Sequence, residues 1–261
     1  SRSSICEEGD CEQAVRYRAA VYGSRSANGV IILTTKMGKN TKPTFNFNGY
    51  YGVSDPVYLI PVLDGPGYLQ KVLDFRQAVG LEADPGNIED YLSVTEAENY
   101  RNGKTIDWYD KIVQTGATQN YNLNISGKTE QTNYYLSGTY YSQEAIVEND
   151  DFERVTLRAN FTNHITDWFS VSLKTSFSSL DYSGVEAGLY YGLSPYGGYW
   201  EDEQKGVYQE FPMEDPFFTH PLMNTFVDNK EVQTSALGLI SSELEVPFIE
   251  GLKWTLNYSS N

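Results

Sequence analysis

Residues 169–178, FSVSLKTSFS, decide the fold class of this chain. Phe169, Val171, Leu173 and Phe177 fall on one side of an extended backbone, because successive side chains of a β-strand point to opposite faces. Serine and lysine occupy the other side. The stretch therefore predicts a strand with one apolar and one polar face.

The same alternation recurs along the chain. It is clear at 44–53, 119–126, 154–162 and 252–259. It is less decisive at 132–142, where tyrosine occurs on both sides, and at 232–246, where residues 237–240 (LGLI) blur it. Residues 29–35, GVIILTT, instead form an uninterrupted apolar run that predicts a strand buried on both faces. The remaining alternating strands are expected at 44–53, 119–126, 154–162, 132–142, 232–246 and 252–259.

The connections between these strands alternate in length. Long loops are expected at about 54–117 and 182–231, and the other connections are short. Taken along the chain, every second connection is a tight turn. Outer-membrane barrels have short turns at one end and long loops at the other, and their tilted strands need about 9 to 11 residues to cross the lipid. We therefore predict an all-β fold, a transmembrane antiparallel β-barrel represented by about seven strands.

Composition agrees with this prediction and excludes other classes. The 261 residues carry a formal net charge of −16, which argues against a nucleic-acid partner because binding phosphate requires clustered positive charge. The longest aliphatic run is Val30 to Leu33, far too short for a membrane helix. Barrel strands can cross lipid despite the mean hydropathy of −0.46. Many of the 21 tyrosines lie near predicted strand ends, as in an interfacial aromatic girdle or in cross-strand pairs of a soluble sheet.

The first long loop is expected to fold. Asp64-Gly65-Pro66 leads into an amphipathic helical stretch that ends at Gly80, and Ser93 to Glu96 has the spacing of a capping box. The second helix is expected to end at Asn102-Gly103.

The sequence offers little for catalysis or for a metal or cofactor. Two Gly-Lys-Thr triplets lack the glycine that a phosphate-binding loop requires, and His164 and His220 do not form a zinc-binding motif. Acidic clusters at 148–151 and 201–203 lack the calcium-loop register. We therefore predict neither an enzyme nor a cofactor or metal site.

The best binding candidate is the second long loop. Its aromatic rings could stack on sugar rings while carboxylates accept hydrogen bonds from hydroxyl groups, although such a loop could equally pack against itself. The candidate substrate-binding residues are Tyr190, Tyr191, Tyr196, Tyr199, Trp200, Glu201 and Asp202. On the predicted strands, Arg154, Arg158 and Lys174 face away from the apolar side chains, which predicts that they face a barrel lumen.

The stretch RAAVYGSRSANGVIILTTKMGK, which begins at Arg18, resembles the end of the plug domain in SusC/RagA-class TonB-dependent outer-membrane transporters. Later motifs resemble the same class, including Asp107-Trp108, residues 123–127 (LNISG) and residues 134–138 (YYLSG). The resemblance runs from about residue 19 to the end. It assigns a structural plug motif to Tyr22, Gly23, Ser24, Arg25, Asn28 and Gly29.

The resemblance implies a domain division. Residues 1–40 would form the C-terminal end of the plug, although residues 1–18 do not look like the segment that precedes the motif. Residues 41–261 would form the N-terminal part of the barrel. The chain is therefore expected to be a fragment that is not competent for transport alone.

The resemblance also implies a function at the cell outer membrane. We expect TonB-dependent import of oligosaccharides or peptides, together with a SusD-like surface lipoprotein, with the TonB complex contacted through a more N-terminal region. Outer-membrane lipid would surround the barrel. The alternatives are a soluble secreted β-rich carbohydrate-binding module and a secreted hydrolase.

Overall fold

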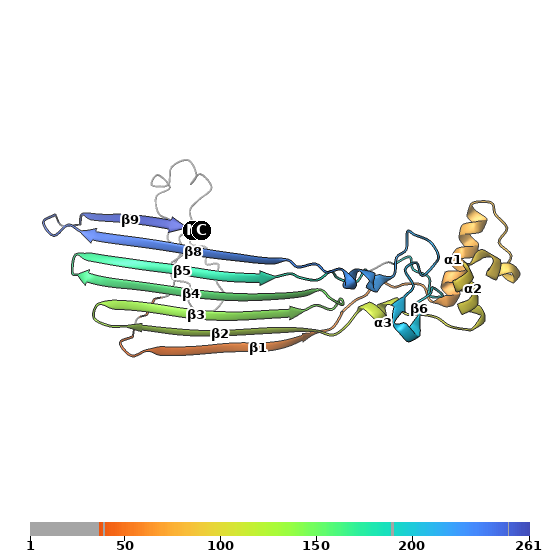
Figure 1. Cartoon of the computed structure of the whole chain (residues 1–261), viewed down its shortest axis with the longest axis horizontal. Coiled ribbons are helices and arrows are strands. Elements are labelled where there is room, and N and C mark those ends of the chain that lie inside the picture. The colour runs from red at the N-terminus through yellow and green to blue at the C-terminus, as the bar shows by residue number, and fades with distance from the viewer. Residues whose placement is uncertain (1–36, 39, 189–190, 250) are drawn as a thin grey trace, which may run out of the picture.

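The structure is a computed structural model that describes residues 37–38, 40–188, 191–249 and 251–261. An antiparallel sheet of seven strands carries a folded cap at one end of its strands (Figure 1). Each strand pairs with the next in the order β1-β2-β3-β4-β5-β8-β9. The strands span Thr44–Ser54 (β1), Gly116–Lys128 (β2), Thr132–Glu144 (β3), Asp151–Thr166 (β4), Phe169–Asp181 (β5), Val232–Glu245 (β8) and Lys253–Ser260 (β9).

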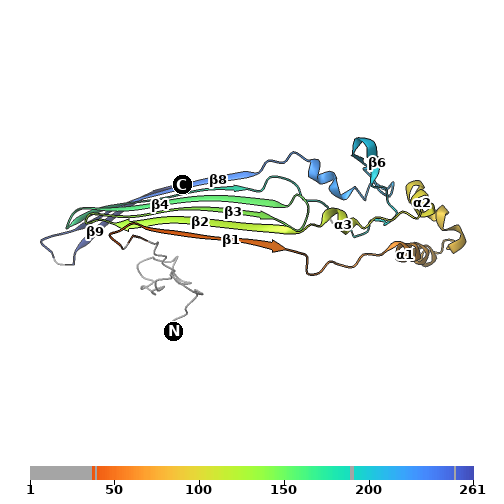
Figure 2. The same cartoon turned by 90° about the horizontal axis from the view of Figure 1, so that it is seen from below.

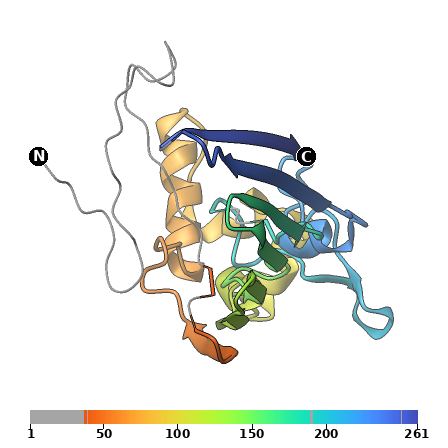
Figure 3. The same cartoon turned by 90° about the vertical axis from the view of Figure 1, so that its left-hand side faces the viewer.

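Seen along the strands, the sheet is an open arc with β1 and β9 at its two edges (Figure 3). All the strands predicted between residues 44 and 259 are confirmed, with boundaries shifted by a few residues. The strand predicted at 29–35 lies outside the described residues, as does the plug motif. In the described part of the chain, no helix is long and apolar enough to cross a membrane.

The register places most of the apolar side chains of the seven strands on one face, whereas Phe152, Leu180, Leu237 and Leu239 project to the other. Leu173 of β5 pairs with Phe161 of β4 and with Ile240 of β8, and directly paired residues project to the same side of a sheet. The same holds from β1 to β9. This apolar face carries Phe45, Phe47, Leu123, Ile125, Leu136, Val155, Leu157, Phe161, Val171, Leu173, Phe177, Ile240, Leu244, Trp254 and Leu256.

The opposite, polar face is joined by hydrogen bonds between side chains of neighbouring strands. Asn46 donates to Asn124 at 3.0 Å, and Asn122 donates to Thr139 at 2.7 Å. Hydroxyl pairs 2.8 Å apart connect β4 with β5 and β5 with β8. Such cross-strand pairs stabilise a sheet and hold its register.

Adjacent tyrosines of β3 are divided between the two faces. Tyr134 and Tyr140 lie on the apolar face, whereas Tyr135 and Tyr141 lie on the polar face. This follows from the pleat, because adjacent residues of a strand point in opposite directions. Only one tyrosine of each pair can therefore belong to a girdle on the apolar side.

The long loops extend from the same end of the sheet and fold together into the cap (Figures 1 and 2). The first loop, residues 55–115, contains α1 (Gly65–Ala78), η2 (Pro85–Tyr91), α2 (Val94–Arg101) and α3 (Trp108–Ile112). The second, residues 182–231, contains β6 (Trp200–Asp202), η3 (Glu203–Lys205), β7 (Val207–Tyr208) and η4 (Pro221–Phe226). The β2–β3, β4–β5 and β8–β9 turns lie at the other end.

The two predicted helices are confirmed, and their caps explain their boundaries. Asp64 caps α1 by accepting a hydrogen bond from Gly67 N, and Gly80, just beyond the helix, has a φ of 76°. At α2, Ser93 and Glu96 form the complete capping box. The 3-10 turns, α3 and the β6–β7 hairpin were not predicted, because they are too short to leave a periodic signal.

Candidate functional site: the apolar sheet face and the cap

The apolar face is exposed. Phe47 is 70% exposed, Leu157 is 52% exposed and Leu256 is 55% exposed, although each is a large apolar side chain. The largest apolar patches on soluble monomers usually measure a few hundred Å² and often mark an interaction site. Exposed apolar side chains of this size recur along the seven strands, so this face is suited to an apolar environment.

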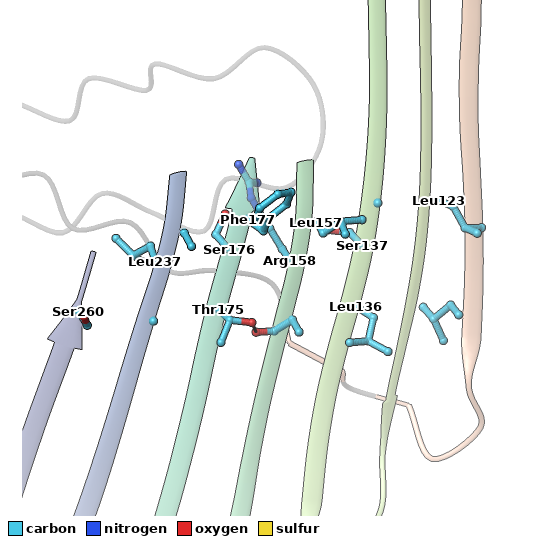
Figure 4. A pocket seen from close by; sticks show the side chains of 15 residues that line it. Leu123, Leu136, Ser137, Leu157, Arg158, Thr175, Ser176, Phe177, Leu237 and Ser260 are labelled. Carbon is cyan, nitrogen blue, oxygen red and sulfur yellow. Dashed lines mark hydrogen bonds between the residues drawn. The ribbon is translucent and has the colours of Figure 1, made fainter. Parts of the chain in front are cut away.

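A shallow hollow of about 640 Å³ lies at the middle of this face (Figure 4). Small residues create it, because Gly138, Ala159, Ala236 and Gly238 leave space between the leucine and phenylalanine side chains of adjacent strands. No described atom lies within 4 Å of the position that a Cβ would take on Gly238. The hollow is lined mainly by carbon.

The three predicted lumen-facing residues lie on the polar face. The register pairs Arg154 with Tyr141, Arg158 with Ser137, and Lys174 with Asn160, all of which project to that side. The Arg154 guanidinium lies over the Tyr141 ring, 5.4 Å from its centre. These charges are therefore separated from the apolar side chains by the sheet itself.

The cap is attached to the sheet where three connections meet. Glu148, in the β3–β4 connection, donates its backbone N–H to Ile112 O at 2.9 Å, and its own carbonyl accepts from Ala187 N at 2.9 Å. Ile112 and Ala187 are each 2% exposed and pack with Leu222. One residue from each long loop thus bonds to the same short connection, which holds both loops against the end of the sheet.

Further hydrogen bonds join the two long loops to each other. Ile106 N donates to Pro195 O at 2.7 Å, and the Trp108 indole N–H donates to Ser194 O at 2.9 Å. Asn99 donates its side-chain amide to Tyr196 O at 2.9 Å. Because buried polar groups are satisfied across this contact, the two loops form one folded unit.

An aromatic cluster at the centre of the cap surrounds His220, which is 1% exposed. The imidazole stacks on the Tyr208 ring with 4.4 Å between centres, and the Trp108 and Tyr199 rings meet it edge to face. Its Nδ1 accepts from Leu222 N, while its Nε2 has no hydrogen-bond partner among the described residues. Burial lowers the pKa of His220 to about 4, so the ring is neutral at pH 7.

The predicted substrate-binding residues do not converge on one surface. Tyr196 is buried and meets Tyr100 edge to face, and Tyr199 lies within the aromatic cluster, where burial raises its pKa to about 12. Trp200 stacks on Tyr208 at 4.5 Å. Tyr191 is 54% exposed and lines a cavity between the loops. Tyr190 lies outside the described residues.

The two predicted acidic residues differ from each other. Asp202 accepts a hydrogen bond from the Lys205 ammonium at 2.6 Å, which holds the pKa of its carboxyl below the usual value. Glu201 is exposed and makes no hydrogen bond with a described side chain. Asp202 is therefore engaged in the η3 turn, whereas the Glu201 carboxylate faces solvent.

Sequence reasoning did not identify His220 as a structural centre or Glu214 as a link between the loops. No local signal could have identified either, because both depend on contacts with the distant first loop. Trp108 was noted only through its resemblance to a family motif. From the sequence around Trp108, the residue that its indole ring would contact in the second long loop could not be predicted.

Comparison with known proteins gives a consistent picture. The sequence matches no protein-family model. It is 36% identical over 155 residues to TonB-dependent receptor P3 of Formosa agariphila, covering 59% of this chain and 13% of that protein. It is 29% identical over 206 residues to TonB-dependent receptor SusC of Bacteroides thetaiotaomicron, covering 70% of this chain and 18% of that protein. The chain thus spans less than a fifth of the length of these curated relatives.

Solved structures show the same fold. The RagAB peptide importer in its open-open state matches with a TM-score of 0.68 at 22% identity, covering 92% of this chain and 30% of that one. The RagAB peptide transporter matches with a TM-score of 0.66, also at 22% identity, and covers 91% of this chain. In sequence and in fold, the chain is therefore a relative of the SusC/RagA class of TonB-dependent receptors.

Proposed function

We propose that the described sheet forms part of the wall of an outer-membrane importer, with its apolar face against lipid and its polar face toward the lumen. One observation carries the proposal: the register gathers most of the apolar side chains of seven strands on a single exposed face. A soluble module would have to leave that face in water, and this makes the carbohydrate-binding alternative the weaker one.

The dimensions of the apolar face support a membrane location. On β5, the apolar stretch from Phe169 to Phe177 extends about 27 Å along the strand, which becomes about 21 Å at a tilt of about 40°. Outer-membrane barrels have an apolar band about 25 Å tall. Toward the cap, this band ends at acidic residues, since Glu153 and Asp181 pair at the end of the same face.

The distribution of charge supports the proposed orientation. An arginine or lysine that faces lipid at the midplane costs about 2 to 4 kcal/mol. Arg158 and Lys174 lie in the middle of their strands and avoid this cost on the polar face. They are therefore proposed to face the lumen, as is Arg154.

The cap would lie at the cell exterior, because barrels of this kind have their long loops on that side. We propose that a SusD-like lipoprotein covers it, that import is coupled to the TonB complex, and that the cargo is an oligosaccharide or a peptide. The relatives include a receptor named SusC and a peptide importer named RagAB, which supports this direction. Residues 1–40 are proposed as the end of the plug and residues 41–261 as barrel.

The membrane assignment can be tested with spin labels on three consecutive residues of β5. Val171→Cys and Leu173→Cys place a label on the apolar face, and Ser172→Cys is the matched control on the polar face. In lipid bilayers, we expect oxygen to reach the labels at 171 and 173 more readily than a water-soluble nickel chelate, with the preference reversed at 172. Equal access of the nickel chelate to all three labels would contradict the proposal.

The transport assignment needs a separate experiment in cells. Uptake of a fluorescent oligopeptide and of a fluorescent oligosaccharide would be compared in cells with and without the full-length protein. We expect one cargo to enter only when the protein is present and the proton gradient is intact, because TonB coupling requires energy. Uptake that persists after the gradient is abolished would argue against TonB coupling.

A further inference from the structure

A cavity of about 230 Å³ lies in the cap between the two long loops. The first loop contributes the residues before α1 and those at the start of α3, and the second contributes Tyr191, Leu193 and Pro195. This cavity is separate from the hollow on the apolar face. Its size suits a single side chain or a small polar group rather than several sugar rings.

The walls of the cavity are apolar and aromatic. Tyr109 and Tyr191 line it together with Trp108. The hydrogen-bond donors of two of these rings are already engaged, because Trp108 Nε1 donates to Ser194 O and the Tyr109 hydroxyl donates to Ile60 O. These two rings can therefore offer a ligand chiefly their carbon surfaces and the negative faces of their π-systems.

Two solvent-exposed aspartates complete the lining. Asp64 and Asp107 each use Oδ1 to cap a helix, accepting from Gly67 N at 2.9 Å and from Tyr109 N at 3.0 Å, respectively. The Oδ2 atom of each makes no hydrogen bond and no ion pair with a described residue, and among the described residues that line the cavity none is basic. Burial, followed by the neighbouring Tyr191, Tyr58 and Asp107, raises the pKa of the Tyr109 hydroxyl.

We propose that this cavity binds a positively charged group on an apolar stem, in particular the lysine side chain of a peptide. A butyl stem would contact the aromatic walls, and the ammonium would pair with the free carboxylate oxygens of Asp64 and Asp107. A neutral sugar would gain no ion pair with either carboxylate. The inference rests on the proposed function, because imported cargo would first meet the cap. A site of this kind favours a peptide cargo over a glycan.

The test is a titration of the full chain in detergent, followed by the fluorescence of the cap tryptophans. The probes are N-acetyl-lysine amide and N-acetyl-norleucine amide, which share a linear stem but differ in charge. Glycine amide tests whether a peptide amino terminus is bound instead. We expect the lysine probe to bind at least about tenfold more tightly than either of the other two.

The matched variants remove charge but retain the helix caps. Asparagine is as good an N-cap as aspartate, so Asp64→Asn and Asp107→Asn should leave α1 and α3 in place. Asp84→Asn makes the same change at the cap of η2, and Asp84 does not line the cavity. The double variant Asp64→Asn, Asp107→Asn should lose about tenfold or more of its affinity for the lysine probe, with Asp84→Asn unchanged.

Three results would overturn the inference. These are equal binding of the lysine and norleucine probes, lysine affinity that survives the double variant, and no lysine binding at all. Tighter binding of glycine amide would reject a lysine site in favour of an amino-terminus site. None of these results depends on the bilayer, so the spin-label experiment would still decide the proposed membrane function separately.

Discussion

Glu214 caps helix α2 from the opposite loop, 119 residues away in sequence: its Oε1 accepts hydrogen bonds from the Thr95 amide at 2.9 Å and from the Thr95 hydroxyl at 2.7 Å. These bonds from Thr95 hold the pKa of the Glu214 carboxyl below its usual value. The backbone of Glu214 has a φ of 58°, which is uncommon for a residue other than glycine. The contact thus holds an unfavourable backbone conformation in place.

Glu214→Ala should loosen the contact between the loops. It leaves the Thr95 amide, one of the free N–H groups of the first helical turn, without its acceptor, which costs about 0.5 to 2 kcal/mol. We expect faster hydrogen exchange at Thr95 and little change in the sheet. Glu214→Gln retains an acceptor and should be milder, and Glu210→Ala is the matched control. Unchanged exchange in Glu214→Ala would show that water replaces the carboxylate without loss.

The same contact should weaken in acid. Because the pKa of Glu214 is lowered by folding, its contribution to stability is complete above the unfolded value of about 4.3 and is lost as the pH falls through the lower folded value. The exchange of the Thr95 amide, corrected for its intrinsic pH dependence, should therefore show an opening transition below about pH 4. Glu214→Gln should abolish that transition. Its persistence in this variant would assign it to another group.

His220 should make the whole cap sensitive to pH in a higher range. Its folded pKa of about 4 lies below the unfolded value of about 6.5, so the unfolded cap binds more protons between these values. The free energy of unfolding of the cap should therefore fall as the pH drops from about 6.5 to about 4. Thermal melting followed by near-ultraviolet circular dichroism would measure this, and His220→Phe should flatten the dependence. His164→Phe, on the exposed end of β4, is the control.

The two faces of β5 should respond oppositely to a charge. In lipid vesicles, Leu173→Arg should lower the free energy of unfolding by about 2 to 4 kcal/mol, because the guanidinium would face acyl chains. Ser172→Arg places the same group on the polar face, beside Thr162, and should change that free energy by much less. Similar losses in both variants would mean that the two faces meet the same solvent.

Two glycines should differ in their tolerance of a methyl group. A Cβ on Gly116 would lie 2.6 Å from the backbone oxygen of Glu144, so that Gly116→Ala must displace the strand. Gly238→Ala instead points into the hollow of the apolar face, where no described atom lies within 4 Å. We expect a loss of more than about 1 kcal/mol for the first and little change for the second, measured by denaturant unfolding.

The strands of the sheet were predictable because their signal is local. Alternation at 169–178 follows from the pleat of one strand, and the capping box at Ser93 involves residues three positions apart. The alternation of long loops and short turns also indicated that both long loops would extend from the same end of the sheet. The roles of the candidate binding residues were not predictable, because whether Tyr196 is buried or Tyr191 is exposed depends on packing against the first loop.

Sequence by itself determined the period, the length and the order of the strands, since each depends on neighbouring residues of a single segment. Only the tertiary structure decided what the loops became. It brought Glu148, Ile112 and Ala187 into contact, buried His220, and placed Asp64 and Asp107 beside one cavity. Those arrangements depend on contacts between residues far apart in the chain, which a local pattern does not contain.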